Sequence, residues 1–147
     1  MTDARAYPER PFLAVSAAII RDGKVLVVRR ARPPANDLFS LPGGLVISGE
    51  TLIEALVREV REETALEVEP GALAGFREVI VRDADSRAER HFVVLAFAAR
   101  WLAGEPRLNE ELSDARWLHP SELASLPTTE GLAEIVAQAF ERMEQAG

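Results

Sequence analysis

The sequence contains no cysteine, which excludes a disulfide scaffold, a cysteine-ligated zinc site and catalysis by a thiol. Long apolar runs are also missing. The longest covers eight residues, 92–99, whereas a membrane-spanning helix needs about 20. The residues that follow Met1 lack the apolar segment of a signal peptide, so we expect a cytoplasmic protein without membrane attachment.

The residues that are present are typical of a globular chain, with 48% hydrophobic and 28% charged residues over 147 positions. That length fits a single domain, 1–147, in which residues 1–10 form a flexible or edge arm. The net charge of −7 disfavours a nucleic-acid polymer as partner. The charge is uneven, however, because residues 21–32 are basic and residues 50–69 hold seven glutamates against two arginines. A small anionic substrate stays compatible with this pattern where positive charge is supplied locally.

Turn signals and periodicity predict the order strands, helix, strands, helix. Residues 12–30 indicate two strands joined at Asp22-Gly23, because Asp-Gly between apolar runs favours a hairpin turn. Residues 31–44 indicate a loop with at most a short strand at 38–41. Other expected elements are strands at 73–81, 91–102 and 116–118, a helical turn at 119–122, and a second amphipathic helix at 129–145. This order predicts a sheet flanked by helices in an α/β or α+β arrangement.

The helix expected at 51–65 is the most informative element. Thr51 and Glu54 fit a capping box at its start, and Pro70-Gly71 ends any continuation. At about 100° per residue, its core-facing stripe consists of Ile53, Leu56, Val57, Val60 and Thr64. On the same count, one arc that points away from the core holds Glu59, Glu62 and Glu63.

These three carboxylates lie at spacings where their side chains meet, and each like-charge pair costs a few tenths of a kcal/mol, roughly. A helix built for stability alone would place lysine or arginine between them. Converging carboxylates suit Mg²⁺, which takes oxygen ligands. The alternative is a solvated acidic surface. Two glycines just upstream, Gly43 and Gly44, argue against it, because glycine pairs indicate a backbone that approaches another group closely or takes a positive φ.

The segment 44–66 resembles the signature of the Nudix hydrolases, G-x5-E-x7-R-E-U-x-E-E-x-G-U with U aliphatic. Gly44 and Glu50 have the required spacing, and Arg58-Glu59 and Glu62-Glu63 follow in register. Ala65 stands where the pattern has glycine, a change that softens the loop after the helix but removes no ligand. The resemblance implies an α/β/α sandwich with a mixed central sheet. The chain is most similar to the ADP-ribose pyrophosphatase-like branch.

The resemblance also implies roles for individual residues. The expected ligands of Mg²⁺, or of Mn²⁺, are Glu59, Glu62, Glu63, Glu50 directly or through water, and the backbone oxygen of Gly43. The expected catalytic set is Glu62, Glu63, Arg58 and Glu111. In this set Arg58 orients a glutamate. The general base is either a glutamate of the helix or one on a later loop, where Glu110 and Glu111 match by position and Glu111 is the one assigned to the catalytic set.

Substrate contacts are expected from Gly44 and from the basic stretch that holds Arg29, Arg30 and Arg32. Because strand side chains alternate between faces, at most one of Arg29 and Arg30 points at the substrate. Candidate partners for a nucleobase are Asn36, Asp37 and Asn109.

The function implied is Mg²⁺-dependent hydrolysis of a nucleoside diphosphate derivative, with ADP-ribose giving AMP and ribose 5-phosphate. The alternatives are a nucleoside triphosphate pyrophosphohydrolase and a catalytically silent nucleotide or metabolite sensor. The complete glutamate set argues against a sensor. The partner is therefore a small-molecule nucleotide, and members of the family are often homodimers.

Overall fold

The computed structural model describes residues 4–31 and 37–146. Its sheet has seven strands: β1 (Phe12–Arg21), β2 (Lys24–Arg30), β3 (Phe39–Ser40), β4 (Gly43–Leu45), β5 (Glu67–Arg82), β6 (Ala88–Ala103) and β7 (Leu112–Leu118). The helices are α1 (Leu52–Thr64), the short 3₁₀ helix η1 (Pro120–Ser125) and α2 (Leu132–Ala146). None of the described helices is long and apolar enough to cross a membrane.

The sheet is mixed, as expected. The strand order is β3-β2-β1-β6-β5, with β4 beside β1 and β7 beside β2. The pairing of β1 with β6 is parallel, and the other pairings are antiparallel. Strand β6 is central, as its apolar sequence predicts, because β1 and β5 lie on its two sides.

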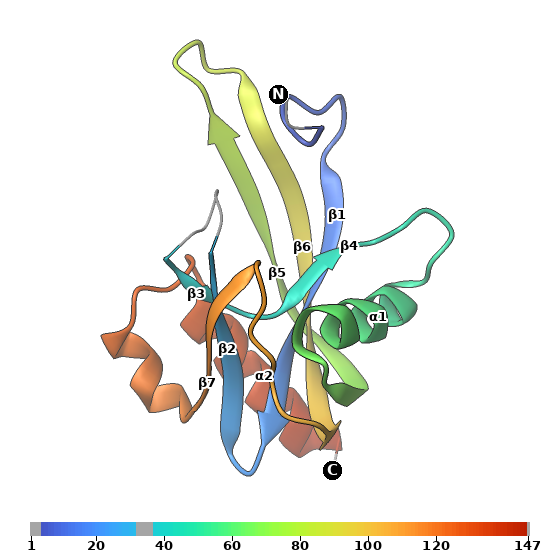
Figure 1. Ribbon diagram of the computed structural model, residues 1–147, viewed down its shortest axis with the longest axis vertical. Helices are drawn as coiled ribbons and strands as arrows, with labels where there is room; N and C mark the ends of the chain where they lie inside the picture. The colour runs from blue at the N-terminus through green and yellow to red at the C-terminus, as the bar shows by residue number, and fades with distance from the viewer. Residues whose placement is uncertain (1–3, 32–36, 147) are drawn as a thin grey trace.

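Helices α1 and α2 lie on opposite faces of the sheet (Figure 1), and an apolar cluster forms the core beneath each of them. One cluster packs Leu56 and Val60 of α1 against β1, β2 and β6, and the other packs Val136 and Ala139 of α2 against the opposite face. This arrangement confirms the α/β/α sandwich, since each helix buries its apolar stripe against one side of the sheet.

Strand β1 changes its neighbour along its length, and this change creates space for a site. Near its end, Ile20 and Arg21 pair with Val25 and Lys24 of β2. Nearer its start, residues 14–16 pair instead with β4. Strands β1 and β2 therefore separate, and strand β4, which begins within the segment 31–44 expected to be a loop and ends at Leu45, fills part of the gap. A cavity occupies the rest.

The described part of the N-terminal arm, residues 4–10, lies beside the tip of the β5–β6 hairpin, which extends beyond the body of the molecule (Figure 1). Tyr7 donates a hydrogen bond from its hydroxyl to Asp83 at 2.8 Å, and its backbone N–H donates to the carbonyl of Glu89 at 2.9 Å. The guanidinium of Arg87 lies 4.5 Å from the centre of the Tyr7 ring. Three contacts therefore join the arm to the hairpin.

Strand β5 is longer than expected. It begins at Glu67, directly after α1, and continues through Pro70-Gly71 with interruptions of its register against β6. Proline is tolerated there because β5 is an edge strand, so one row of its N–H groups faces away from the sheet. Pro70-Gly71 thus marks irregular pairing within a strand.

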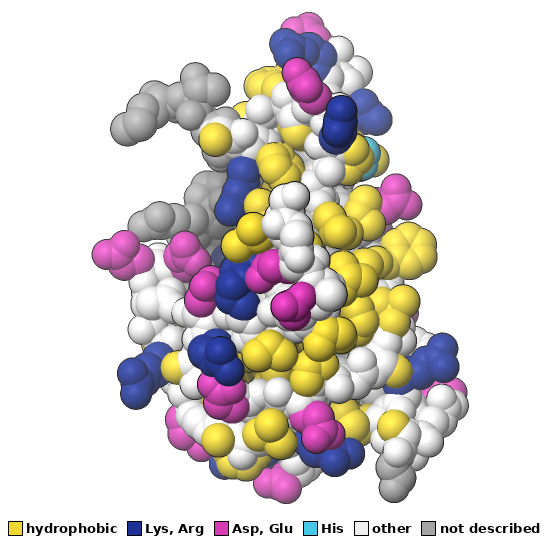
Figure 2. Space-filling model, turned by 90° about the vertical axis from the view of Figure 1, so that its right-hand side faces the viewer, with side chains coloured by type: hydrophobic (Ala, Val, Ile, Leu, Met, Phe, Trp, Pro, Cys, Tyr) yellow, Lys and Arg dark blue, Asp and Glu magenta, His cyan; other side chains and the backbone are white. Residues whose placement is uncertain are grey.

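Several large apolar side chains on this part of the sheet remain exposed, among them Leu13, Phe76 and Ile80. Figure 2 shows apolar side chains gathered in a band on one face of the molecule, with acidic and basic side chains beside it. A face of this kind is suited to a partner surface. The expected homodimer stays a prediction.

Candidate active site

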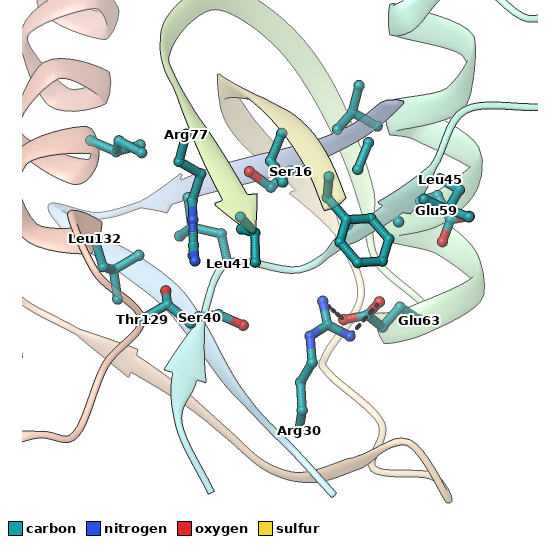
Figure 3. A pocket seen from close by; sticks show the side chains of 18 of the residues that line it. Ser16, Arg30, Ser40, Leu41, Leu45, Glu59, Glu63, Arg77, Thr129 and Leu132 are labelled. Atoms are coloured by element: carbon teal, nitrogen blue, oxygen red, sulfur yellow. Dashed lines mark hydrogen bonds and ion pairs between the residues drawn. The ribbon is translucent and has the colours of Figure 1, made fainter. Parts of the chain in front are cut away.

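A cavity of about 530 Å³ lies between α1, the separated strands β1 and β2, and the start of α2 (Figure 3). That volume falls in the range of small-molecule sites, roughly 300–1,000 Å³. Its polar lining comes from the signature segment on one side and from strands β2, β3 and β5 on the other. The charged residues of this lining are Arg5, Arg30, Glu59, Glu62, Glu63, Arg77, Glu111 and Glu130.

Helix α1 begins with the predicted capping box. Thr51 accepts a hydrogen bond from the N–H of Glu54 at 3.1 Å, and Glu54 accepts one from the N–H of Thr51 at 2.9 Å. Glu50 precedes this cap, and its carboxylate accepts a hydrogen bond from the N–H of Ile47 at 2.9 Å. The cap thereby fixes Glu50 beside the second turn of the helix, within reach of Arg58.

Arg58 joins the glutamates of the signature to one another. Its Nε and Nη2 lie 2.6 and 2.8 Å from the two carboxylate oxygens of Glu50, and Nη2 also donates to the carbonyl of Leu45 at 3.0 Å. Its Nη1 donates to Glu59 at 2.8 Å and to Glu62 at 3.1 Å. These bonds use all five N–H donors of a guanidinium. Arg58 is therefore a positioning residue without a free donor for substrate.

The same network sets the charge of Glu50. Hydrogen bonds from Arg58 and from the N–H of Ile47 lower the pKa of Glu50 to about 2. Its carboxylate is consequently ionised at neutral pH, while the pKa of Arg58 is raised by its bonds to Glu50 and Glu59.

The two glycines of the signature allow a close approach of backbone segments. A Cβ at Gly43 would overlap the carbonyl oxygen of Val15 on β1, and a Cβ at Gly44 would overlap the carboxylate of Glu59. Glycine is therefore required at position 43, where the overlap is with backbone, and a side chain at position 44 would displace the carboxylate of Glu59. The main chain of β4 then lies directly against the carboxylate of Glu59, at the wall of the cavity.

Glu63 is buried, which corrects the expectation that all three glutamates point away from the core. Its side chain is only 5% exposed, whereas Ile53, expected in the core stripe, is 41% exposed. The buried face of α1 is centred near Leu56, not Ile53. Glu63 lies seven residues after Leu56, which is about 20° away on the helix. The sequence pattern had centred the core-facing stripe on Ile53, a residue that faces solvent.

The surroundings of Glu63 raise its pKa, so that in the metal-free protein a substantial share of this carboxyl is protonated near neutral pH. Desolvation, with the nearby charges of Glu59 and Glu111, raises the pKa of Glu63 to about 7, against opposing effects of Arg30 and the N–H of Gly43. The ion pair between Oε1 of Glu63 and Nη2 of Arg30 is long, at 3.4 Å. This Oε1 accepts no hydrogen bond from any residue that the structure describes. This buried oxygen is directed into the cavity beside Arg30 (Figure 3).

The donor set fits a hard divalent cation. Oxygen ligands are what Mg²⁺ binds, and the partnerless buried oxygen of Glu63 and the carboxylate of Glu59 both line the cavity. Among the residues that the structure describes, no three acidic or histidine side chains are already grouped as a metal-binding set. Glu62 is turned toward Arg58 and its side chain is 61% exposed, so it would have to leave Arg58 to act as a ligand.

The two arginines at the end of β2 lie on different faces. Arg30 contacts Glu63 in the cavity, while Arg29 donates to the hydroxyl of Ser113 at 3.0 Å and lies 5.7 Å from the centre of the Phe39 ring. Of the two, only Arg30 lines the cavity. The predicted substrate contact Arg32 and the nucleobase candidate Asn36 fall outside the described residues.

Glu111 lines the cavity on a loop that is attached to the end of α1. The attachment is Asn109, whose side-chain N–H₂ donates to the carbonyl of Glu63 at 3.0 Å. The amide oxygen of Asn109 accepts from the N–H groups of Glu111 at 2.8 Å and of Leu112 at 3.0 Å. Asn109 thus holds the loop of Glu111 against the end of α1. This role differs from the nucleobase contact that was considered for Asn109.

Among the cavity residues that were not singled out from the sequence, two have a polar atom without a hydrogen-bond partner among the described residues. Arg77 of β5 and Ser40 of β3 each have a buried polar atom, Nε and Oγ, without a hydrogen-bond partner. For Arg77 the sequence contains one signal, a single cation within the otherwise apolar and acidic segment 73–81. For Ser40 we find none.

The fold and the carboxylate-rich helix define an enzyme that hydrolyses a pyrophosphate linkage. The chain belongs to the Nudix family, since the family model, described as NUDIX domain, matches residues 10–139. This finding confirms the resemblance seen in the signature.

Relatives with different stated activities share the domain. An ADP-ribose pyrophosphatase of Methanocaldococcus jannaschii is 32% identical over 79% of this chain and 66% of its own length. A putative 8-oxo-dGTP diphosphatase 2 of Mycobacterium tuberculosis is 36% identical over 72% of this chain and 79% of its own length. Among solved structures, a MutT NUDIX hydrolase from Burkholderia pseudomallei is 29% identical, with a TM-score of 0.76 over 88% of this chain and 98% of the other.

Proposed function

We propose that the protein hydrolyses ADP-ribose to AMP and ribose 5-phosphate in the presence of Mg²⁺. The observation that carries the proposal is Glu63, a buried carboxylate at a cavity large enough for a nucleotide, whose Oε1 accepts no hydrogen bond from the described residues and has only a long ion pair with Arg30. The relative from M. jannaschii, named an ADP-ribose pyrophosphatase, supports the choice of substrate.

In this proposal Glu59, Glu62 and Glu63 hold the metal, with Glu50 and the backbone oxygen of Gly43 as further ligands. A bound Mg²⁺ neutralises phosphate charge and lowers the pKa of coordinated water. Mn²⁺ has similar ligand preferences and is the alternative ion. Arg58 keeps Glu50 and Glu59 in place, because its bonds to both are short and partly buried.

Two further residues act on the substrate. Glu111 accepts the proton of the attacking water, whose oxygen forms the new bond to phosphorus as the bridging P–O bond breaks. Arg30 donates to phosphate oxygens, since its present ion pair with Glu63 is long and its guanidinium borders the cavity. Gly44 keeps the floor of the site free of a side chain.

A nucleoside triphosphate is the second candidate substrate, because the M. tuberculosis relative is named as a diphosphatase of 8-oxo-dGTP. The test is a panel of ADP-ribose, other nucleoside diphosphate derivatives and nucleoside triphosphates with excess Mg²⁺. AMP with ribose 5-phosphate supports the first proposal, and a nucleoside monophosphate with pyrophosphate supports the second. Absence of turnover on the whole panel would favour a silent nucleotide sensor.

The site assignment has its own test. Glu63→Gln and Glu62→Gln should each abolish hydrolysis while the circular dichroism spectrum and the unfolding transition stay cooperative. Glu54→Gln, which changes a glutamate of the same helix outside the cavity, is the control. Turnover at the wild-type rate in either cavity variant would contradict the assignment.

A further inference from the structure

The cavity has a second polar region, on the side away from the glutamates of α1. Figure 3 shows Arg77 pointing into the cavity on the side of Ser40 and Thr129, while Glu59 and Glu63 lie on the opposite side. Arg77 comes from β5 and Ser40 from β3, so neither belongs to the signature segment. The two regions are supplied by different parts of the chain.

Arg77 is a cation without a counter-ion in contact. It forms no hydrogen bond or ion pair with any residue that the structure describes, and its Nε is buried. Desolvation lowers the pKa of Arg77, and the charge of the exposed Glu130 opposes that effect only in part. The Nε–H group of Arg77 has lost water without gaining a partner among the described residues, which is energetically costly, and a bound anion would provide that partner.

Ser40 adds an independent observation at the same place. Its side chain is only 8% exposed, and its Oγ has no hydrogen-bond partner. A buried hydroxyl without a partner is uncommon and requires an explanation. The Ser40 hydroxyl and the Arg77 guanidinium line the same cavity, and both can donate to oxygen atoms that carry negative charge.

The surroundings agree with an anion. Arg5 and Glu130 line the same cavity with opposite charges, so the cation that distinguishes this region is Arg77. The first residue of α2, Leu132, also lines the cavity, and the start of a helix favours negative charge.

We propose that Arg77 and Ser40 form an anion subsite that binds a further phosphate group of the substrate, separate from the pyrophosphate that is hydrolysed. The preferred substrates are then nucleoside diphosphate derivatives that carry an additional phosphate monoester. This inference rests on the proposed function, since the pyrophosphate is taken to lie at the glutamates of α1.

The subsite can be tested without metal or turnover. Inorganic phosphate is titrated into the metal-free full-length protein, and the ¹H–¹⁵N signal of the Arg77 Nε–H group is followed by NMR after assignment with Arg77→Lys. The Arg77 signal should shift in a saturable manner. The Nε–H signal of Arg82, an exposed arginine on the same strand, is the control and should stay in place. An unmoved Arg77 signal overturns the proposal.

The second test uses matched substrate pairs that differ by one phosphate: ADP-ribose and its 2′-phosphate, NADH and NADPH, and dephospho-coenzyme A and coenzyme A. In at least one pair the phosphorylated member should have a KM lower by about tenfold at similar kcat, as one added charge-assisted contact provides. Arg77→Gln should remove that difference, and Arg82→Gln should keep it. Equal KM values within all three pairs would overturn the proposal.

Folding and the proposed function can be separated from this outcome. Ser40→Ala removes only one hydroxyl, so it should reduce the preference even where Arg77→Gln does not fold. If phosphate shifts the Arg77 signal but no pyrophosphate compound is hydrolysed, the proposed function fails and the subsite stands. If a pyrophosphate compound is hydrolysed but phosphate leaves the Arg77 signal unmoved, the proposed function stands and the subsite is overturned.

Discussion

Arg58 and Glu50 form a two-point ion pair, with Nε 2.6 Å from one carboxylate oxygen and Nη2 2.8 Å from the other. The remaining N–H groups of Arg58 hold Glu59, Glu62 and the carbonyl of Leu45. One guanidinium therefore holds together three carboxylates that would otherwise repel one another.

Arg58→Lys should lower the affinity for Mg²⁺ by roughly 10–100-fold, the usual cost of losing a residue that orients metal ligands. Lysine keeps the charge but cannot make the planar two-point contact. The measurement is the Mg²⁺ dependence of kcat/KM, with calorimetric titration of Mg²⁺ beside it. Arg61→Lys is the matched control, because Arg61 makes a similar two-point contact with Glu67 on the exposed side of α1. Equal effects of the two changes would contradict a special role for Arg58.

The buried carboxylate of Glu63 should make the metal-free protein less stable as pH rises. Its pKa is about 7 in the folded state and near 4.5 when unfolded, so the folded state binds more protons between these values. The free energy of unfolding should fall across this window by up to about 3 kcal/mol. Urea unfolding in EDTA at pH 5 and pH 8 measures this fall in the free energy of unfolding. Glu63→Gln should remove this component, whereas Glu141→Gln, exposed on α2, should leave it unchanged.

Glu111→Gln should slow turnover by more than about tenfold if Glu111 is the general base, as general-base catalysis typically contributes 10²–10⁴-fold. Glu110→Gln, at the neighbouring position outside the cavity, is the control. An unchanged kcat would assign the proton transfer to a glutamate of α1.

Asn109→Ala tests how Glu111 is held. The side chain of Asn109 joins the carbonyl of Glu63 to the N–H of Glu111, so its loss should lower kcat more than it raises KM. In the Glu111→Gln background the same change should have little further effect, because the group that it positions is gone. Additive losses in the double variant would show that Asn109 acts independently of Glu111.

Ala65→Gly should stabilise the fold by about 1 kcal/mol, because only glycine adopts the left-handed conformation without steric cost. Ala65 ends α1 with φ 68° and ψ 14°, so alanine here is strained, which corrects the expectation that it softens the loop. The check is chemical denaturation of both proteins at one pH. Ala124→Gly, at an exposed position of η1 outside the cavity, is the control and should not stabilise.

Local signals in the sequence were sufficient for most of the fold. The Asp22-Gly23 turn, the Thr51–Glu54 cap and the apolar stripe of α2 depend on neighbouring residues alone, and the structure has all three. Strand β4 has only three residues, two of them glycine, and it forms because β1 offers it a partner. Such pairing is a tertiary effect that propensity does not predict.

The site likewise has some residues whose grouping the local sequence predicts and others whose place depends on the tertiary fold. The signature predicted the grouping of Arg58 and Glu59 on one helix with Glu50, which lies just before its N-cap. The burial of Glu63 depends on where the sheet lies relative to that helix, and Arg77 is near the site only because β5 borders the cavity. Neither relationship is present in the local sequence.

The attachment of the N-terminal arm to the β5–β6 hairpin has a practical consequence for how the enzyme is prepared. Arg5 lines the cavity, and Tyr7 holds the arm on Asp83 and Glu89. Protein shortened to begin at Phe12, or fused to a bulky partner just before residue 4, would have an altered cavity wall. Rates measured on such material would describe a different binding site, so purification tags are better placed after α2.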